Sequence, residues 1–142
     1  MVSTQFLHVA LNCNDPIAIE RFYTQYFGFK RARVYDPGPT QVVVIQAGSL
    51  SLELFPAVGE APTWPAGKAG PEYQGLRHMA FLVDDLDAKL AELGDQVKID
   101  LEPLDMGKYI PGMRVAWVTD PEGNILELSE GYVNETAPPP LT

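Results

Sequence analysis

The chain has 142 residues, of which 46% are hydrophobic and 20% charged, a composition typical of a folded globular domain. Its net charge of −9 disfavours nucleic-acid binding, because an acidic surface repels phosphates and the basic residues are scattered. No apolar run approaches the roughly 20 residues that span a bilayer, and no secretory signal is visible at the N-terminus. We therefore expect a single domain over residues 1–142, located in the cytoplasm, with no membrane or nucleic-acid partner.

The first half of the chain shows the pattern of a strand, a helix and three further strands. Over residues 5–13 every second side chain from Leu7 onward is apolar and the side chains between them are mixed, which predicts a strand with one core-facing side. Asp15 and Pro16 then predict the start of a helix over 16–27, and Gly28 predicts its end. Short turns rich in proline and glycine separate three more predicted strands, at residues 30–35, 41–46 and 49–55.

The second half repeats this order. A strand is expected at residues 76–83, Asp85 is expected to cap a helix that ends at Gly94, and three strands follow at 98–101, 114–119 and 124–129. We interpret residues 5–56 and 76–132 as two modules, residues 57–75 as a linker, and residues 133–142 as a disordered tail. The repeat predicts an α+β fold in which two tandem βαβββ modules form a curved mixed sheet around a metal-containing cleft.

Cys13 is the only cysteine, which excludes an internal disulfide and a thiolate metal cluster. It stands at the end of the first predicted strand, on the face whose other members are uniformly apolar. We therefore expect a buried structural thiol rather than a reactive one.

Two histidines and two glutamates occupy matching places in the two modules. His8 and His78, the two histidines of the chain, lie on the first strand of each module, and Glu53 and Glu127 lie on the last strands. Two imidazoles and two carboxylates suit a divalent first-row metal and leave positions open for water or substrate oxygens. Such an ion can polarise a carbonyl or stabilise an enediolate, and a glutamate released from it can act as a base. The matched positions favour this interpretation over four unrelated structural roles.

These segments resemble the vicinal oxygen chelate superfamily, which includes glyoxalase I, methylmalonyl-CoA epimerase, extradiol dioxygenases, and the bleomycin and fosfomycin resistance proteins. The resemblance covers about residues 5–132 and depends on His8-Val9-Ala10-Leu11, on residues 77–85 and on residues 120–128. It implies paired βαβββ modules and a homodimer that binds a small-molecule substrate. The site would be built within one chain or from modules of two chains.

Position 53 distinguishes members of this superfamily. Extradiol dioxygenases and fosfomycin enzymes use two histidines and one carboxylate, which His8, His78 and Glu127 would supply. Glyoxalase I has a further glutamate where Glu53 stands, and the epimerase has a glutamine. The resemblance thus implies a divalent ion (Zn, Ni, Fe, Mn or Co) with Glu53 and Glu127 as ligands and catalytic bases, and a metal-ligand set of His8, Glu53, His78 and Glu127.

Two departures from bacterial glyoxalase I concern the substrate. That enzyme has an arginine four residues after its first histidine, which contacts glutathione, where this chain has Asn12. It also has an asparagine four residues after its first glutamate, where this chain has Ala57. Whether the substrate is a glutathione adduct therefore stays open. Lys108 and Arg114 are candidates for holding an anionic substrate, with a solvated surface role as the alternative.

Three functions are consistent with these observations. The first is a glyoxalase I-like lyase or isomerase that depends on a divalent metal. The second is an iron-dependent dioxygenase that uses His8, His78 and Glu127, with Glu53 beside the ligands. The third is a non-enzymatic protein that binds or sequesters a small molecule without metal. Elemental analysis separates the third from the other two, and oxygen consumption separates the second from the first.

Overall fold

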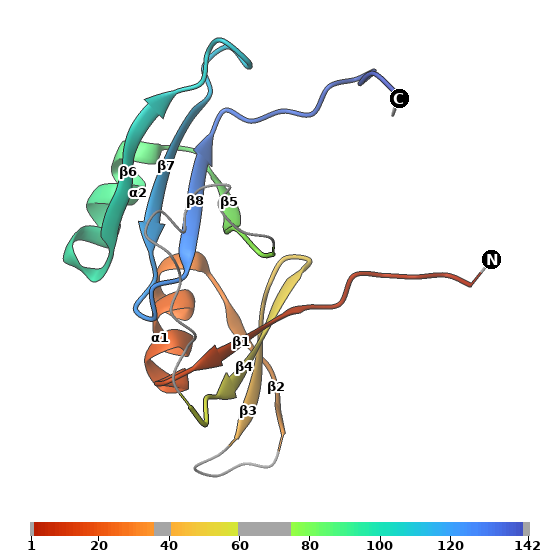
Figure 1. Ribbon diagram of the computed structural model, residues 1–142, viewed down its shortest axis with the longest axis vertical. Helices are drawn as coiled ribbons and strands as arrows, with labels where there is room; N and C mark the ends of the chain where they lie inside the picture. The colour runs from red at the N-terminus through yellow and green to blue at the C-terminus, as the bar shows by residue number, and fades with distance from the viewer. Residues whose placement is uncertain (1, 36–40, 60–74, 141–142) are drawn as a thin grey trace. The chain divides into compact units, whose positions relative to one another are not determined.

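The computed structural model describes residues 2–35, 41–59 and 75–140. Residues 60–74, most of the predicted linker, lie outside the described residues. The eight strands form two four-stranded mixed sheets, one for each module (Figure 1). The chain divides into two compact units, and Asp120–Gly123 belong to the same unit as the first module. The fold is therefore α+β with two βαβββ modules, as the repeat predicts.

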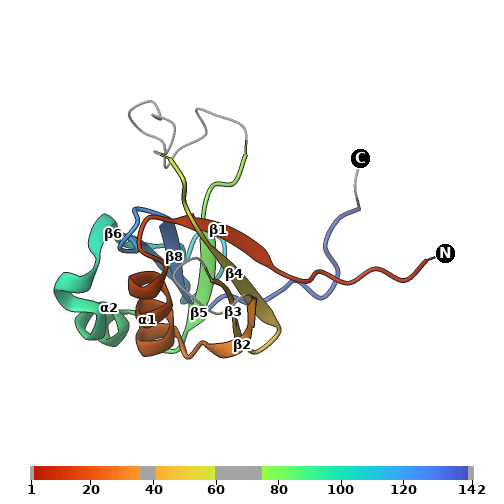
Figure 2. The same ribbon diagram turned by 90° about the horizontal axis from the view of Figure 1, so that it is seen from below.

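The first module forms a sheet of strand order β1-β4-β3-β2 with one helix against it. Strand β1 is parallel to β4, and the other pairs are antiparallel (Figures 1 and 2). The elements are β1 (Val9–Cys13), α1 (Pro16–Phe27), β2 (Lys30–Tyr35), β3 (Val42–Ala47) and β4 (Leu50–Pro56).

Helix α1 begins and ends at the residues that the sequence predicts. The Asp15 carboxylate accepts a hydrogen bond from the Ala18 N–H, and Pro16 occupies the first helical position, where no backbone donor is needed. At the other end Gly28 has a φ of 70°, a left-handed conformation that costs glycine little, and its N–H donates to the Tyr23 carbonyl. The buried side of α1 packs on β1 and β4.

A buried hydrogen bond attaches the turn between the last two strands to the first module. The Tyr23 hydroxyl donates to Asp120 Oδ2 at 2.8 Å, and the Asp15 N–H donates to Glu122 Oε1 at 2.7 Å. Burial and the neighbouring Asp120 carboxylate raise the pKa of Tyr23 well above its usual range, so its hydroxyl stays protonated and donates. The turn Asp120–Gly123 thus packs with residues about a hundred positions earlier in the chain.

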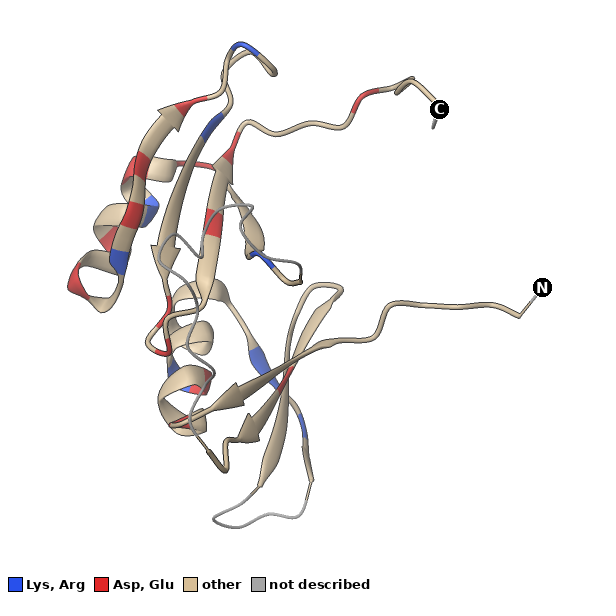
Figure 3. Cartoon of the chain, viewed as in Figure 1, with Lys and Arg blue, Asp and Glu red and all other residues tan. Residues whose placement is uncertain are grey.

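The second module repeats the topology, with strand order β5-β8-β7-β6 and β5 parallel to β8 (Figure 2). The Asp85 carboxylate caps the helix by accepting from the Ala88 N–H. Acidic residues gather along α2 and β6 (Figure 3). The elements are β5 (Met79–Val83), α2 (Leu86–Leu93), the 3-10 turn η1 (Gly94–Gln96), β6 (Lys98–Asp105), β7 (Arg114–Thr119) and β8 (Ile125–Glu130).

The first strand of each module is shorter than its alternating pattern predicts. Strand β1 begins at Val9 and β5 at Met79, so His8 and His78 stand directly before their strands. Val9 is paired with Leu52, two residues after the start of β4, so β4 has no residues left to pair with those before Leu7. Phe6 and Leu7 are both exposed. Strand β6 is longer than predicted and includes Pro103, which an edge strand tolerates because it needs no donor on its free side.

No helix within the described ranges is long and apolar enough to cross a membrane. Residues 133–140 are exposed and form neither helix nor strand.

Cys13 is expected to be inert in the folded chain. Its side chain is fully buried, and burial together with the carboxylates of Glu122 and Asp120 raises its pKa to about 12. Because only the thiolate is nucleophilic, we expect the native thiol at pH 8 to react with a disulfide reagent about a thousand-fold more slowly than in urea. The rate is measured as the release of the thiol that the disulfide reagent loses when it reacts with Cys13. Equal rates in the native and unfolded chains would contradict the burial.

Candidate functional site

The first predicted pair, His8 and Glu53, is brought together in the first unit. His8 Nε2 lies 3.6 Å from Glu53 Oε1, and the side chains are 29% and 14% exposed. Glu53 is flanked on β4 by the fully buried Leu52 and Leu54. Because side chains alternate along a strand, Glu53 lies on the sheet face opposite to these core residues. The pair is therefore partly open to solvent rather than part of the core.

The second pair, His78 and Glu127, has the same arrangement in the second unit. His78 Nε2 lies 3.4 Å from Glu127 Oε2, and each side chain is 20% exposed. The neighbours of Glu127 on β8, Leu126 and Leu128, are fully buried on the other face. The matched positions predicted from the repeat thus give matched contacts, one in each module.

The donor atoms of each pair are suitably spaced for one metal ion. Two ligand atoms about 2.1 Å from the same ion lie about 3.0 Å apart at a right angle and about 3.4 Å apart at the tetrahedral angle. The observed separations of 3.4 and 3.6 Å are close to the second value. Among the described residues, no three His, Cys, Asp or Glu side chains form a group that could hold an ion. Each module taken alone therefore brings together two potential metal ligands.

His78 differs from an ordinary structural histidine. Its Nδ1 atom is buried and has no hydrogen-bond partner within the part of the chain that the structure describes. Buried polar atoms normally have partners, and a histidine that serves packing alone would have both ring nitrogens satisfied. Nδ1 is not the nitrogen that faces Glu127, so the candidate metal-binding atom of His78 is Nε2, which lies 3.4 Å from Glu127 Oε2.

Two hydrogen bonds fix the carboxylate of Glu127. Trp117 Nε1 donates to Oε2 at 3.0 Å, and Ser129 Oγ donates to Oε1 at 2.8 Å. Trp117 is the cross-strand partner of Glu127, and the centre of its ring lies 5.8 Å from that of His78. Trp117 is not among the site residues predicted from the sequence. The turn at Asp120–Gly123 could have identified it, because this turn sets the register of β7 against β8.

Glu53 has no such support. Its cross-strand partner on β3 is Val44, which has no side-chain donor. Within the described residues, the only polar side chain recorded against the Glu53 carboxylate is that of His8. The two glutamates are therefore equivalent in position but not in environment: Glu127 accepts a hydrogen bond at each oxygen, whereas Glu53 lies against His8.

The two cations considered for an anionic substrate both have other contacts. Arg114 binds both carboxylate oxygens of Asp87, at 2.9 and 3.0 Å, and lies 3.6 Å from Glu130. The hydrogen bonds to Asp87 raise the pKa of Arg114, and this pair ties α2 to β7. The Lys108 ammonium lies 5.6 Å from the centre of the Tyr109 ring. These contacts favour the surface role for both residues.

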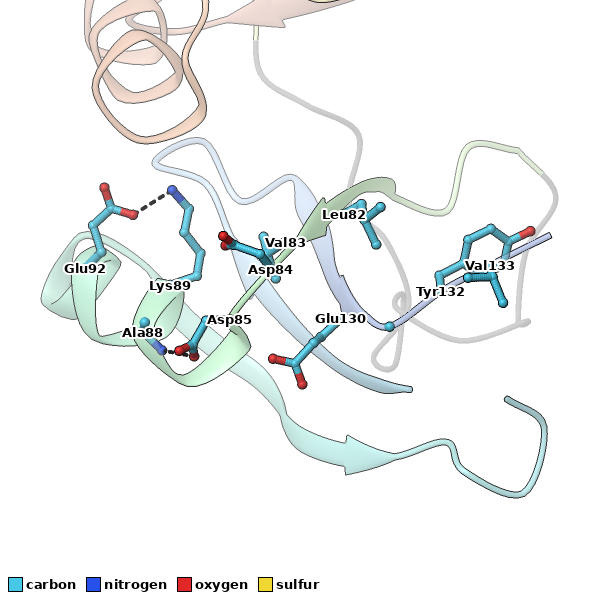
Figure 4. A pocket seen from close by; sticks show the side chains of 11 residues that line it. Leu82, Val83, Asp84, Asp85, Ala88, Lys89, Glu92, Glu130, Tyr132 and Val133 are labelled. Carbon is cyan, nitrogen blue, oxygen red and sulfur yellow. Dashed lines mark hydrogen bonds and ion pairs between the residues drawn. The ribbon is translucent and has the colours of Figure 1, made fainter. Parts of the chain in front are cut away.

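A pocket in the second unit lies between the end of β5, helix α2 and the residues that follow β8 (Figure 4). Its lining includes neither His78 nor Glu127. Two of its carboxylates stabilise the start of α2: Asp85 accepts from the Ala88 N–H, and Glu130 accepts from the Leu86 N–H. Lys89 is paired with Glu92. We assign these polar groups to the fold rather than to the site.

The family model described as "Glyoxalase/Bleomycin resistance protein/Dioxygenase superfamily" matches residues 5–128. The chain belongs to this superfamily. Its members include metal-dependent enzymes and resistance proteins.

Similar proteins cover almost the whole length of the chain. YwkD of Bacillus subtilis is 32% identical over 126 residues, which are 87% of this chain and 94% of that protein. YaeR of Escherichia coli is 33% identical over 129 residues, 89% of this chain and 95% of that protein. The solved structure of a glyoxalase family protein from Enterococcus faecalis is 32% identical, covers 89% of this chain and 97% of its own, and has a TM-score of 0.67.

Proposed function

We propose that this member of the superfamily is a divalent-metal-dependent enzyme of the glyoxalase-like type. Its metal ligands would be His8, Glu53, His78 and Glu127. The observation that supports this most strongly is the duplicated contact, an imidazole Nε2 at 3.4 or 3.6 Å from a carboxylate oxygen in each module. The two pairs would share one ion, either within one chain or between two chains of a homodimer.

The reaction we propose is a lyase or isomerase reaction that moves a proton beside a carbonyl. A divalent ion at this site supplies Lewis acidity that polarises a substrate carbonyl and acidifies the neighbouring C–H bond. Glu127, fixed by Trp117 and Ser129, stays in place as a ligand. For an α-hydroxycarbonyl substrate, Glu53, which lacks hydrogen-bond donors, would take the proton from that carbon and return it to the carbonyl carbon, while the hydroxyl proton passes from one substrate oxygen to the other. One C–H and one O–H bond break and one of each forms, so no oxidant or second substrate is needed.

Metal content tests this proposal. We expect the purified protein, after reconstitution with Zn, Ni, Fe, Mn or Co, to hold about one ion for each set of four ligands, measured by elemental analysis. The variant His78→Asn should lose this ion while circular dichroism shows an unchanged fold. Absence of stoichiometric metal after reconstitution would exclude both metal-dependent functions and leave the non-enzymatic binder. Bound iron together with substrate-dependent oxygen uptake would favour the dioxygenase.

A further inference from the structure

Two arginines near the histidine–glutamate pairs have aromatic rather than acidic neighbours. The chain has 19 acidic residues and only 10 basic ones, so carboxylates are abundant. Four cations pair with them, namely Arg31, Lys89, Lys98 and Arg114. Arg33 instead lies 5.8 Å from the centre of the Tyr35 ring, and Arg77 lies 5.2 Å from that of Trp117. Within the described part of the chain, no carboxylate is paired with either guanidinium.

Arg77 is connected to the second pair through one indole ring. It directly precedes His78 in the chain, and its guanidinium lies over the Trp117 ring. The same ring donates a hydrogen bond to Glu127 and lies 5.8 Å from the ring of His78. A cation stacked on an aromatic face keeps its N–H groups free at the edge. Those donors are therefore available beside the proposed ligands.

Arg33 stands in the same cross-strand row as Glu53. It is paired with Val44, and Val44 is paired with Glu53, so the three residues lie on one face of the sheet. Neighbouring strands are about 4.8 Å apart, which places the Arg33 backbone about 10 Å from that of Glu53. The side chains of Arg31 and Arg33 point in different directions. A register shift lies between the two residues, and Arg31 binds Glu20 of α1. Positive charge thus lies in the same cross-strand row as Glu53.

We propose that Arg77 binds a carboxylate group of the substrate and that the charge of Arg33 adds to the attraction for this anion, so that the substrate is an organic acid with a metal-binding pair of oxygens. This inference rests on the proposed function and extends it to the substrate class. A guanidinium binds a carboxylate through two parallel hydrogen bonds, which a neutral group cannot reproduce. A chain of net charge −9 would otherwise repel such a substrate. Arg77 carries the larger share, because its contacts include the ring next to both His78 and Glu127.

A matched pair of probes tests the role of the carboxylate. We would titrate zinc-loaded protein with 3,4-dihydroxybenzoate and with 3,4-dihydroxybenzamide, which offer the same two vicinal oxygens and differ only in charge at the far end. We expect the benzoate to bind about ten-fold more tightly, as measured by calorimetry at low salt. This preference should disappear in Arg77→Gln, decrease in Arg33→Gln and return in part in Arg77→Lys. The amide should bind equally well to all four proteins.

Arg21 provides the control, because it is an exposed arginine on α1, the helix that covers the opposite face of the first sheet. Arg21→Gln removes the same charge and should keep the preference. Equal affinity for the two probes, binding of neither probe, or a preference that survives both arginine substitutions would overturn the inference. Failure of the proposed function would appear separately, as absence of zinc uptake before any probe is added. In that case Trp117 fluorescence in a Trp64→Phe background, with the same two probes, still decides whether Arg77 binds the carboxylate.

Discussion

Replacing Glu127 by glutamine is expected to lower the affinity of the protein for a divalent ion by about 100-fold or more. A charged oxygen ligand becomes a neutral one, and the loss of even a supporting residue around a metal ligand typically costs 10–100-fold. The fold should survive, because the amide oxygen can accept from Trp117 Nε1 and the amide N–H₂ can donate to Ser129 Oγ. Calorimetric titration with zinc measures the affinity, and urea unfolding measures the stability.

Two further variants make this experiment specific to the site. Glu102→Gln removes the same charge from an exposed glutamate on β6 of the same sheet, and its metal affinity should not change. Trp117→Phe keeps an aromatic ring beside His78 but removes the donor to Glu127, and we expect a loss of about ten-fold. If Glu127→Gln binds zinc as tightly as the unchanged protein, Glu127 is not a ligand.

The parts of the fold that the sequence predicts correctly depend on local signals. Asp15, Pro16 and Gly28 define α1 because a cap, a first-turn proline and a left-handed glycine act within a few residues. The ends of the strands are less well predicted, because they depend on a partner. Strand β1 cannot start at residue 5, since β4 begins only at Leu50. Attachment of Asp120 to Tyr23 depends on a contact between distant segments, which no local pattern indicates.

For the candidate site, the repeat provides what local patterns cannot. A single histidine near a strand is weak evidence, whereas equivalent positions in two modules predict both contacts, His8 with Glu53 and His78 with Glu127. Duplication does not predict how the two pairs differ. The difference is visible only when each sheet has its register, with Trp117 opposite Glu127 and Val44 opposite Glu53. Which of the two carboxylates accepts hydrogen bonds from neighbouring side chains is therefore known only from the structure.

Glu53→Gln is expected to separate catalysis from metal binding. We propose that Glu53 is released from the ion when it acts as the base, so it should contribute less to holding the ion than Glu127, and zinc affinity should fall by only about ten-fold. Glutamine cannot take up a proton, however, and loss of a general base typically costs 10²–10⁴-fold. Hydroxyacetone offers two vicinal oxygens. In D₂O the zinc-loaded protein should catalyse exchange of the hydrogens on its hydroxymethyl carbon, which is next to the carbonyl. The rate, followed by NMR, should fall at least about 100-fold in Glu53→Gln.

Comparison with Glu127→Gln shows which carboxylate is the base. At a zinc concentration high enough to saturate both variants, Glu127→Gln should recover a measurable part of the exchange. In the unchanged protein the Glu127 carboxylate is expected to serve as a ligand rather than as the proton acceptor, so its loss is offset by added zinc. Glu53→Gln should recover none, since its defect is not in metal occupancy. The reverse result, with exchange retained in Glu53→Gln and lost in saturated Glu127→Gln, would assign the proton transfer to Glu127. The hydrogen bonds from Trp117 and Ser129 would then orient the base rather than immobilise a ligand.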